Sequence, residues 1–186
     1  MMALQRTNCS IMDRTIIKRR KDLLHRRNLL NEIHFTHVNL ARALRAMVPR
    51  ELSGRLGRAL KGQHDHDEKA RQVLADLGMD LGMPPGPCVC ADSMAVLAAL
   101  RYADRVDRGD AHRDVGIISA LREVRVFVIR LWGALLDGIE QEQGRSGMFQ
   151  RILRLQEEEA DQHRDLVRLA GMLSGESDGG SLKRTA

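Results

Sequence analysis

The sequence predicts an all-α protein, an antiparallel four-helix bundle with a short extra helix in the connection between its two helical pairs. Leu, Ala, Arg and Met are abundant, whereas the 186 residues include one Trp, one Tyr and three Phe. Four long segments repeat apolar residues at spacings of three and four, the period of an α-helix. A stretch rich in Pro and Gly, "MDLGMPPGPCVC", divides these segments into two pairs. The length suits one domain with a full core.

The first pair of helices is expected over residues 22–48 and 52–77. Pro49 should end the first helix, because proline cannot continue one, and Gly78 should close the second. The inward stripes consist of Leu30, Ile33, Leu40, Leu44 and Met47 in the first helix, and of Leu56, Ala59, Leu60, Ala70, Val73, Leu74 and Leu77 in the second.

The second pair is expected over residues 115–141 and 148–173, with a turn at "GRSG" between them. Before it, Asp92 or Ser93 could cap a short helix that carries the chain from one pair to the other. The stripe of the third long helix is Leu121, Val124, Phe127, Val128, Leu131 and Leu135. One core is predicted, with Ile33, Leu40, Leu60, Leu74, Val124, Phe127, Leu131, Ile152 and Leu166 as members.

The two ends of the chain differ from the bundle, which is assigned to residues 22–173. Residues 1–21 form a basic arm, and the polar, Gly-rich residues 174–186 are expected to be disordered. The net charge is +5, and much of the excess lies in "KRRKDLLHRR", which starts at Lys18. Such a segment could contact nucleic acid. No aromatic platform or recognition motif accompanies it, so a solvated basic arm is the alternative.

Composition also bears on location. No apolar run approaches the ~20 residues that a membrane span needs, and no secretory signal opens the chain. The three cysteines are an odd number, which argues against a disulfide framework and favours a reducing cytoplasm. Cys88 and Cys90 form a "CVC" motif that could bind a soft metal, but the motif is a weak signal, and ordinary thiols are the alternative.

Polar residues that can bind metals interrupt three of the four stripes near mid-helix. His37 falls between Ile33 and Leu40 in the first helix, His66 or Asp67 falls in the second, and Glu159 is followed by Gln162 or His163 in the last. The spacing turns Asp65 and Glu68 toward water and places His64 at the boundary. Buried polar groups need partners. The sequence therefore predicts that His37, His66, Glu159 and His163 converge, either around an ion or in hydrogen bonds with one another.

The third long helix does not supply matching ligands. Val126 and Val128 cannot bind a metal, Glu123 lies off the centre of the stripe, and Arg125 would add positive charge where a cation should sit. A di-iron site bridged by carboxylates takes carboxylates from all four helices. Three imidazoles and one carboxylate suit a single Fe, Zn or Cu ion better.

The order of these segments resembles the YciE/YciF-type ferritin-like family from about residue 24 to residue 170. The stretches that carry the resemblance are "HVNLARALRAM", "HDHDEKARQVLADLG", "CADSMAVL", "DVGIISALREVRVFVIRLWGALL" and "LRLQEEEADQHRDLVRLA". No single motif is diagnostic, and the match rests on the order and spacing of all of them. The resemblance implies a ferritin-like bundle, a metal-binding and stress-associated protein, and assembly as a homodimer.

The family's metal ligands fall on altered positions in this chain. The glutamate of the first helix falls on His37, the histidine of the second on His66, and its preceding glutamate near Gly62. The Glu, His and Glu of the third long helix fall on Arg125, Val126 and Val128. The last-helix glutamate survives as Glu158 or Glu159, and the following aspartate falls on His163.

Two functions follow from these expectations, besides the weaker alternative of nucleic-acid contact by the basic arm. The first is a ferritin-like, stress-associated protein whose di-iron site is lost or remodelled; the residues that remain could bind a single ion, and ferroxidase activity is the less favoured part of the resemblance. The second is a metal-free bundle that serves in dimerisation or interaction, for which an outward apolar strip of Val126, Ile129 and Leu136 is the candidate surface.

Overall fold

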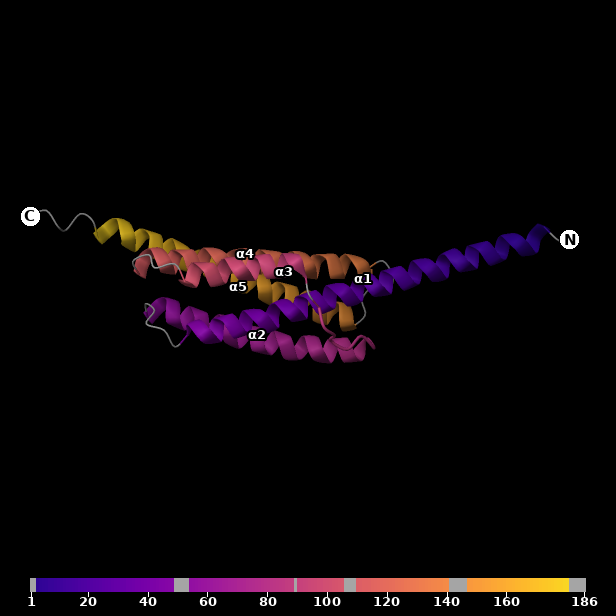
Figure 1. Cartoon of the computed structure of the whole chain (residues 1–186), viewed down its shortest axis with the longest axis horizontal. Helices are drawn as coiled ribbons and strands as arrows, with labels where there is room; N and C mark the ends of the chain where they lie inside the picture. The colour runs from indigo at the N-terminus through magenta and orange to yellow at the C-terminus, as the bar shows by residue number, and fades with distance from the viewer. Residues whose placement is uncertain (1–2, 49–53, 89, 106–109, 141–146, 181–186) are drawn as a thin grey trace, which may run out of the picture.

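The computed structural model describes residues 3–48, 54–88, 90–105, 110–140 and 147–180. This part of the chain contains helices and no strand, which confirms the all-α prediction (Figure 1). The elements are α1 (Ala3–Met47), α2 (Gly54–Asp80), α3 (Ala91–Arg105), α4 (Asp110–Glu140) and α5 (Gly147–Gly180). None of these helices contains a stretch long and apolar enough to span a bilayer.

The four long helices form two antiparallel pairs (Figure 1). α1 packs along α2, and α4 packs along α5. The short helix α3 lies on α4 and also contacts α1, so it leads the chain from the first pair to the second. Contact between the pairs is made mainly by α1 with α4, and the contact between α2 and α5 is less extensive. This is the predicted bundle with a helix in its middle connection.

One hydrophobic core runs through the bundle. Most of the predicted members are buried, namely Ile33, Leu40, Leu60, Leu74, Val124, Ile152 and Leu166. Phe127 and Leu131 are only partly buried at the edge of the core. Trp132, absent from the predicted stripe, is fully buried instead. The inward line of α4 therefore continues from Val128 through Trp132, a step of four residues, rather than through Leu131.

The outward apolar strip predicted on α4 is wrong at one of its positions. Leu136 is buried, with 8% of its surface exposed, and Val126 and Ile129 are half-buried. Leu136 follows Trp132 by four residues and lies beside the buried Leu135 and Ile139, so it faces the core.

Helix limits also differ from the sequence-based prediction. α1 begins at Ala3, and its first half extends beyond the other helices (Figure 1). The interval Ala3–Met47 contains no Gly or Pro, so nothing in the basic arm interrupts the helix. α5 continues past Ser174 to Gly180, since extending an existing helix requires no new nucleus. Residues 174–180 are therefore helical, and the rest of the tail, for which disorder was also expected, lies outside the described residues.

The end of α2 lies beyond Gly78. Gly82 has a φ of 65°, and its N–H donates to the carbonyl of Met79 (3.0 Å) while that of Met83 donates to the carbonyl of Gly78 (2.7 Å). This is a Schellman cap. A Cβ on Gly78 would meet the carbonyl oxygen of Met83 at 2.7 Å, so Gly78 permits the following loop to fold back on the helix rather than ending it.

The cap of α3 was also misplaced in the prediction. The carbonyl of Cys90 accepts the first helical bond, from the N–H of Met94 (3.0 Å). Ser93 is fully buried inside the helix, where its Oγ lies 3.3 Å from the Glu32 carboxylate and 3.0 Å from the Thr36 hydroxyl. Cys90 also donates its S–H to Glu32 (2.6 Å). These bonds tie the start of α3 to α1.

Candidate functional site

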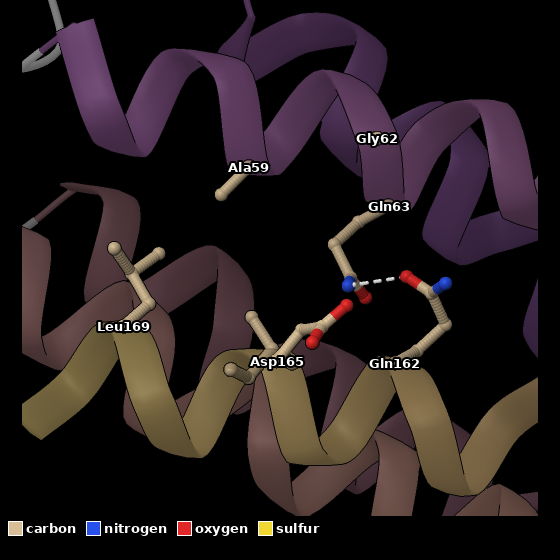
Figure 2. Close-up of a pocket in the computed structure, with 7 residues that line it drawn as sticks. Ala59, Gly62, Gln63, Gln162, Asp165 and Leu169 are labelled. Carbon is tan, nitrogen blue, oxygen red and sulfur yellow. Dashed lines mark hydrogen bonds between the residues drawn. The ribbon is translucent and has the colours of Figure 1, made fainter.

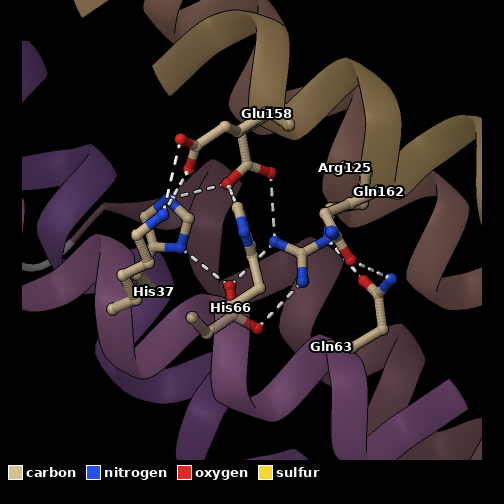
Figure 3. A network of polar contacts seen from close by, with 9 residues as sticks. His37, Gln63, His66, Arg125, Glu158 and Gln162 are labelled. Carbon is tan, nitrogen blue, oxygen red and sulfur yellow. Dashed lines mark hydrogen bonds and ion pairs between the residues drawn. The ribbon is translucent and has the colours of Figure 1, made fainter. Parts of the chain in front are cut away.

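A cluster of polar side chains lies inside the bundle, at the level where the apolar stripes are interrupted (Figure 3). All four long helices contribute to it. Its members are His37 from α1, Gln63, His66 and Asp67 from α2, Arg125 from α4, and Glu159 and Gln162 from α5. His37, Asp67, Arg125 and Glu159 are at most 1% exposed, so their charges must be balanced within the cluster.

The guanidinium of Arg125 is bonded on all sides (Figure 3). It donates Nη1–H to Asp67 Oδ1 (2.8 Å) and to Glu159 Oε2 (3.0 Å), and Nη2–H to Asp67 Oδ2 (2.9 Å). Its Nε–H donates to Gln63 Oε1 (2.8 Å). Burial alone would lower the pKa of Arg125, but the two carboxylates raise it well above its ordinary value. Arg125 is therefore a permanent cation held between Asp67 and Glu159.

His37 is oriented by Asp67. Its Nδ1 lies 2.8 Å from Asp67 Oδ1, and because an ionised carboxylate only accepts, Nδ1 carries the proton. Its Nε2 is buried and makes no hydrogen bond with a described residue. The nearest acidic atom to Nε2 is Glu159 Oε1, 3.4 Å away. His37 therefore directs an unsatisfied nitrogen toward one oxygen of Glu159.

The same oxygen of Glu159 is shared with His66. Nε2 of His66 lies 2.6 Å from Glu159 Oε1, and the rings of His37 and His66 meet edge to face with centroids 6.2 Å apart. Burial would raise the pKa of Glu159, but Arg125, His37 and His66 outweigh it and hold this pKa well below its ordinary range. Glu159 thus faces Arg125 with one oxygen and two imidazoles with the other.

The charges of the carboxylates and the guanidinium in the cluster do not sum to zero. Asp67 and Glu159 carry two negative charges and Arg125 carries one positive charge. With both imidazoles neutral, one negative charge is unbalanced in a nearly solvent-free interior. An imidazole proton or a bound cation can balance it, and either would sit beside Glu159 Oε1.

The donor set does not fit a di-iron centre. Such a centre uses carboxylates from all four helices, whereas the helix α4 contributes a guanidinium here, and Arg125 already engages both buried carboxylates. The pair of His37 and Glu159, however, has the spacing of two ligands to a single ion, whereas Nε2 of His66, 2.6 Å from Glu159 Oε1, is hydrogen-bonded to it. Two ligand atoms that share an ion at about 2.0–2.2 Å lie about 3–3.5 Å apart, and the 3.4 Å between His37 Nε2 and Glu159 Oε1 falls in this range.

His37, Asp67 and Glu159 each offer a ligand atom, and these atoms lie within 4.8 Å of one another. Both oxygens of Asp67, however, accept hydrogen bonds from Arg125, and one also accepts from His37. Asp67 therefore orients His37, whose Nε2 is left without a hydrogen bond, while Nε2 of His66 is bonded to Glu159 Oε1.

Three of the four predicted site residues meet in the cluster, and the fourth does not. His37, His66 and Glu159 meet as described, but His163 is half-buried and makes no hydrogen bond or ion pair with a described residue. His163 lies four residues after Glu159, which turns it about 40° around the helix toward the edge of α5.

The run "HDHDE" separates as its spacing indicated. Asp67 is fully buried, and the side chain of His66 is 8% exposed. Asp65 and Glu68 are exposed, and the His64 side chain retains 22% exposure.

The central role of Arg125 was missed by the sequence analysis, which treated it as an obstacle to a metal. The signal was its position: Arg125 directly follows the core residue Val124 and precedes the core residue Val128 by three. A guanidinium at such a position requires buried acceptors, and Asp67 and Glu159 were the acidic residues on facing stripes.

Beyond Arg125, α2 and α5 enclose a cavity of about 280 Å³ (Figure 2). Gln63 closes its inner end by donating to Gln162 Oε1 (2.7 Å) while accepting from Arg125. Asp165 lies at its rim, and Leu166 and Leu169 form its apolar wall. This cavity therefore leads toward the guanidinium.

Comparisons with known proteins place the fold. No protein-family profile and no curated protein sequence matches the chain. Among solved structures, the Escherichia coli stress protein YciF is similar, with a TM-score of 0.73, 19% sequence identity, and coverage of 81% of this chain and 94% of that chain. The resemblance expected from the sequence is confirmed in its fold: the chain has the same helical-bundle fold as YciF.

Proposed function

We propose that this protein binds one divalent transition-metal ion in the middle of its bundle, through His37, His66 and Glu159. The observation that carries the proposal is Nε2 of His37, which is buried, lacks a hydrogen bond and points at Glu159 Oε1 while Asp67 holds the other nitrogen. Histidines that bind metals commonly donate their second N–H to a carboxylate in this way. Two imidazoles and one carboxylate suit Zn, Fe or Cu.

In this proposal, the positive charge of Arg125 replaces the charge that a second metal ion would supply. It neutralises Asp67 and one side of Glu159, which leaves room for one ion only on the opposite side of Glu159. A bound ion would link α1, α2 and α5, because its ligands His37, His66 and Glu159 come from these three helices. We infer no ferroxidase-type reaction, because the carboxylates that would bridge two irons are not supplied.

The cellular role is proposed by analogy. YciF is described as a stress protein, and we extend that broad role to this chain because the two folds agree. We further propose that the protein is cytoplasmic, which the odd number of cysteines supports, and that it forms a homodimer, which rests on the resemblance to the YciE/YciF-type family.

Metal titration of metal-stripped protein tests the proposal. A ligand at 100 times its dissociation constant stabilises a protein by about 2.7 kcal/mol. For a chain of this size that corresponds to a rise in Tm of about 5–10 °C. Zn²⁺, Cu²⁺ and Fe²⁺ should be titrated separately, and calorimetry should give one ion per chain for those that bind.

Matched histidine variants locate the ion. His37→Gln and His66→Gln should abolish the rise in Tm. His64→Gln is the control, because His64 contacts the exposed Asp65 and not the cluster, and it should leave the rise intact. His163→Gln decides whether His163 joins as a fourth ligand after binding. Equal loss in His64→Gln and His66→Gln would contradict the site.

A metal-free interaction protein is the second candidate, and the charge of the cluster favours it. A proton on either imidazole brings the sum over Asp67, Glu159 and Arg125 to zero, whereas a divalent ion brings it to +1 unless it carries a hydroxide. If none of the three ions raises Tm, the protonated, metal-free bundle is the correct description.

A further inference from the structure

A groove between α2 and α5, with a volume of about 400 Å³, runs along the outside of the cluster. Its lining residues are Asp65, His66, Lys69, Glu158, Asp161 and Gln162. His66 is the residue that the groove shares with the proposed metal site. His37 is fully buried and Glu159 is 1% exposed, so neither reaches solvent.

The ring of His66 separates the groove from the interior. Its Nε2 bonds Glu159 on the inside, and no hydrogen bond from a described residue reaches its Nδ1. His66 lines the groove although only 8% of its side chain is exposed. An imidazole with one nitrogen bonded to Glu159 and the other without a partner can bind a cation at the second nitrogen before the ion passes inward.

The cavity of Figure 2 offers a less favourable approach. It ends at Gln63, and behind Gln63 stands the guanidinium of Arg125 at 2.8 Å. A cation that enters there moves toward a fixed positive charge in a medium of low polarity. In the groove it meets three carboxylates and the imidazole of His66.

The groove carboxylates are held by exposed ion pairs that a cation can replace. Lys69 lies 3.3 Å from Glu158 across the groove, Lys61 lies 2.8 Å from Asp65, and Arg164 pairs with Asp161. Such solvent-exposed pairs contribute about 0–1 kcal/mol each, so exchanging a lysine for a divalent ion costs little.

We propose that metal ions reach the site through the α2–α5 groove, with Glu158 and Asp161 as transient ligands, Lys69 as a competing cation, and His66 as the residue that passes the ion inward. The inference rests on the proposed mononuclear site and adds to it the direction of uptake. Charge at the groove then controls the rate of binding, because fixed charges near a site steer an approaching ion.

Two aspartates on α5 provide a matched pair for the test. Asp161 lines the groove and Asp165 lines the other cavity, they are one turn apart, both are exposed, and each pairs with the arginine three residues on. Asp161→Lys and Asp165→Lys therefore make the same change of charge at the two candidate approaches. Uptake of Co²⁺ by metal-stripped protein would be followed by stopped-flow quenching of Trp132, which lies about 10 Å along α4 from Arg125.

At 0.15 M salt, where charges more than about 8 Å apart are screened, Asp161→Lys should slow uptake about threefold or more. Asp165→Lys should remain near the wild-type rate, and Lys69→Met should accelerate uptake. Each variant should still bind one Co²⁺ at equilibrium. Equal rates for the two aspartate variants, or slowing only by Asp165→Lys, would overturn the groove route while leaving the site in place. Failure of the wild-type protein to bind Co²⁺, Zn²⁺ or Fe²⁺ at equilibrium would instead reject the metal site itself and the route with it.

Discussion

Replacing Arg125 by Met should destabilise the metal-free protein strongly. The substitution keeps the apolar part of the side chain but removes two bonds to Asp67, one to Glu159 and one to Gln63. Two carboxylates would remain in an interior that is at most 1% exposed. Removing one partner from a buried ion pair costs about 3–5 kcal/mol. At about 2–4 °C per kcal/mol for a chain of this length, Tm should fall by about 6–20 °C.

A second substitution shows whether charge is the cause. Asp67→Asn added to Arg125→Met removes one of the uncompensated carboxylates while preserving size. The double variant should be about 1–2 kcal/mol more stable than Arg125→Met alone, although Asp67→Asn alone should destabilise the wild-type protein. Arg125→Lys is the control for geometry, because it keeps the charge but cannot reproduce the forked bonds, and its loss should be intermediate.

The pH dependence follows from the same pairing. Because the pKa of Glu159 is lowered in the folded state, the unfolded chain binds more protons than the native protein as pH falls through the ordinary carboxyl range. The stability due to ionised Glu159 is therefore present above that range and is lost on acidification. Arg125→Met should flatten this dependence, since it removes the strongest charge that lowers the pKa.

Urea unfolding at pH 7 in the presence of a chelator gives the required free energies by linear extrapolation. A free energy of unfolding of Arg125→Met within about 1 kcal/mol of the wild-type value would contradict the buried ion pair. Equal destabilisation by Asp67→Asn in the Arg125→Met variant and in the wild type would contradict it too, because the two side chains would then act independently.

Three further predictions concern other parts of the chain. Trp132 is fully buried with an unpaired Nε1, so Trp132→Ala should cost about 3–5 kcal/mol in urea unfolding, whereas Trp132→Phe should cost less than about 1.5 kcal/mol because it also removes the unpaired donor. Burial, Cys90 and Glu32 raise the pKa of Cys88, so its alkylation at pH 8, followed by peptide mass spectrometry, should be slower than that of glutathione. Truncation before Ser174 should leave the Tm within 2 °C of the full chain if these residues bury little surface, as a terminus of this composition predicts.

The helices were predictable because their cause is local. Apolar residues at three-four spacing identify the inward face of each long segment, and in α1 this placed Ile33, Leu40 and Leu44 correctly. The same rule located His37 and Glu159, since a polar residue on an inward stripe has to be buried. The error on α4 arose where two apolar lines run side by side, Phe127 with Leu131 and Val128 with Trp132. Periodicity ranks such lines poorly, and packing against α1, α3 and α5 decides between them.

The partners within the site could not be predicted from one helix at a time. Glu159 and His163 are four residues apart and share a face by spacing, yet only Glu159 reaches the cluster, because a rotation of about 40° is enough to move a side chain to the edge of a helix. Which acceptors reach Arg125 depends on how α4 packs against α5 and on how far side chains of α2 reach across the bundle. Such information lies in the contacts between helices and in no single stretch of sequence.

The charge of residue 125 determines how many cations the interior can accept. A neutral residue there would leave Asp67 and Glu159 with two negative charges to balance, enough for a divalent ion without further adjustment. With the guanidinium present, Arg125 engages both oxygens of Asp67 and one oxygen of Glu159, while the other oxygen of Glu159 accepts from His66 and faces both imidazoles, so one negative charge remains to be balanced there. In the proposed site, a proton and a metal ion compete for this position. Arg125 thereby confines the proposed ion to the oxygen of Glu159 that faces His37 and His66.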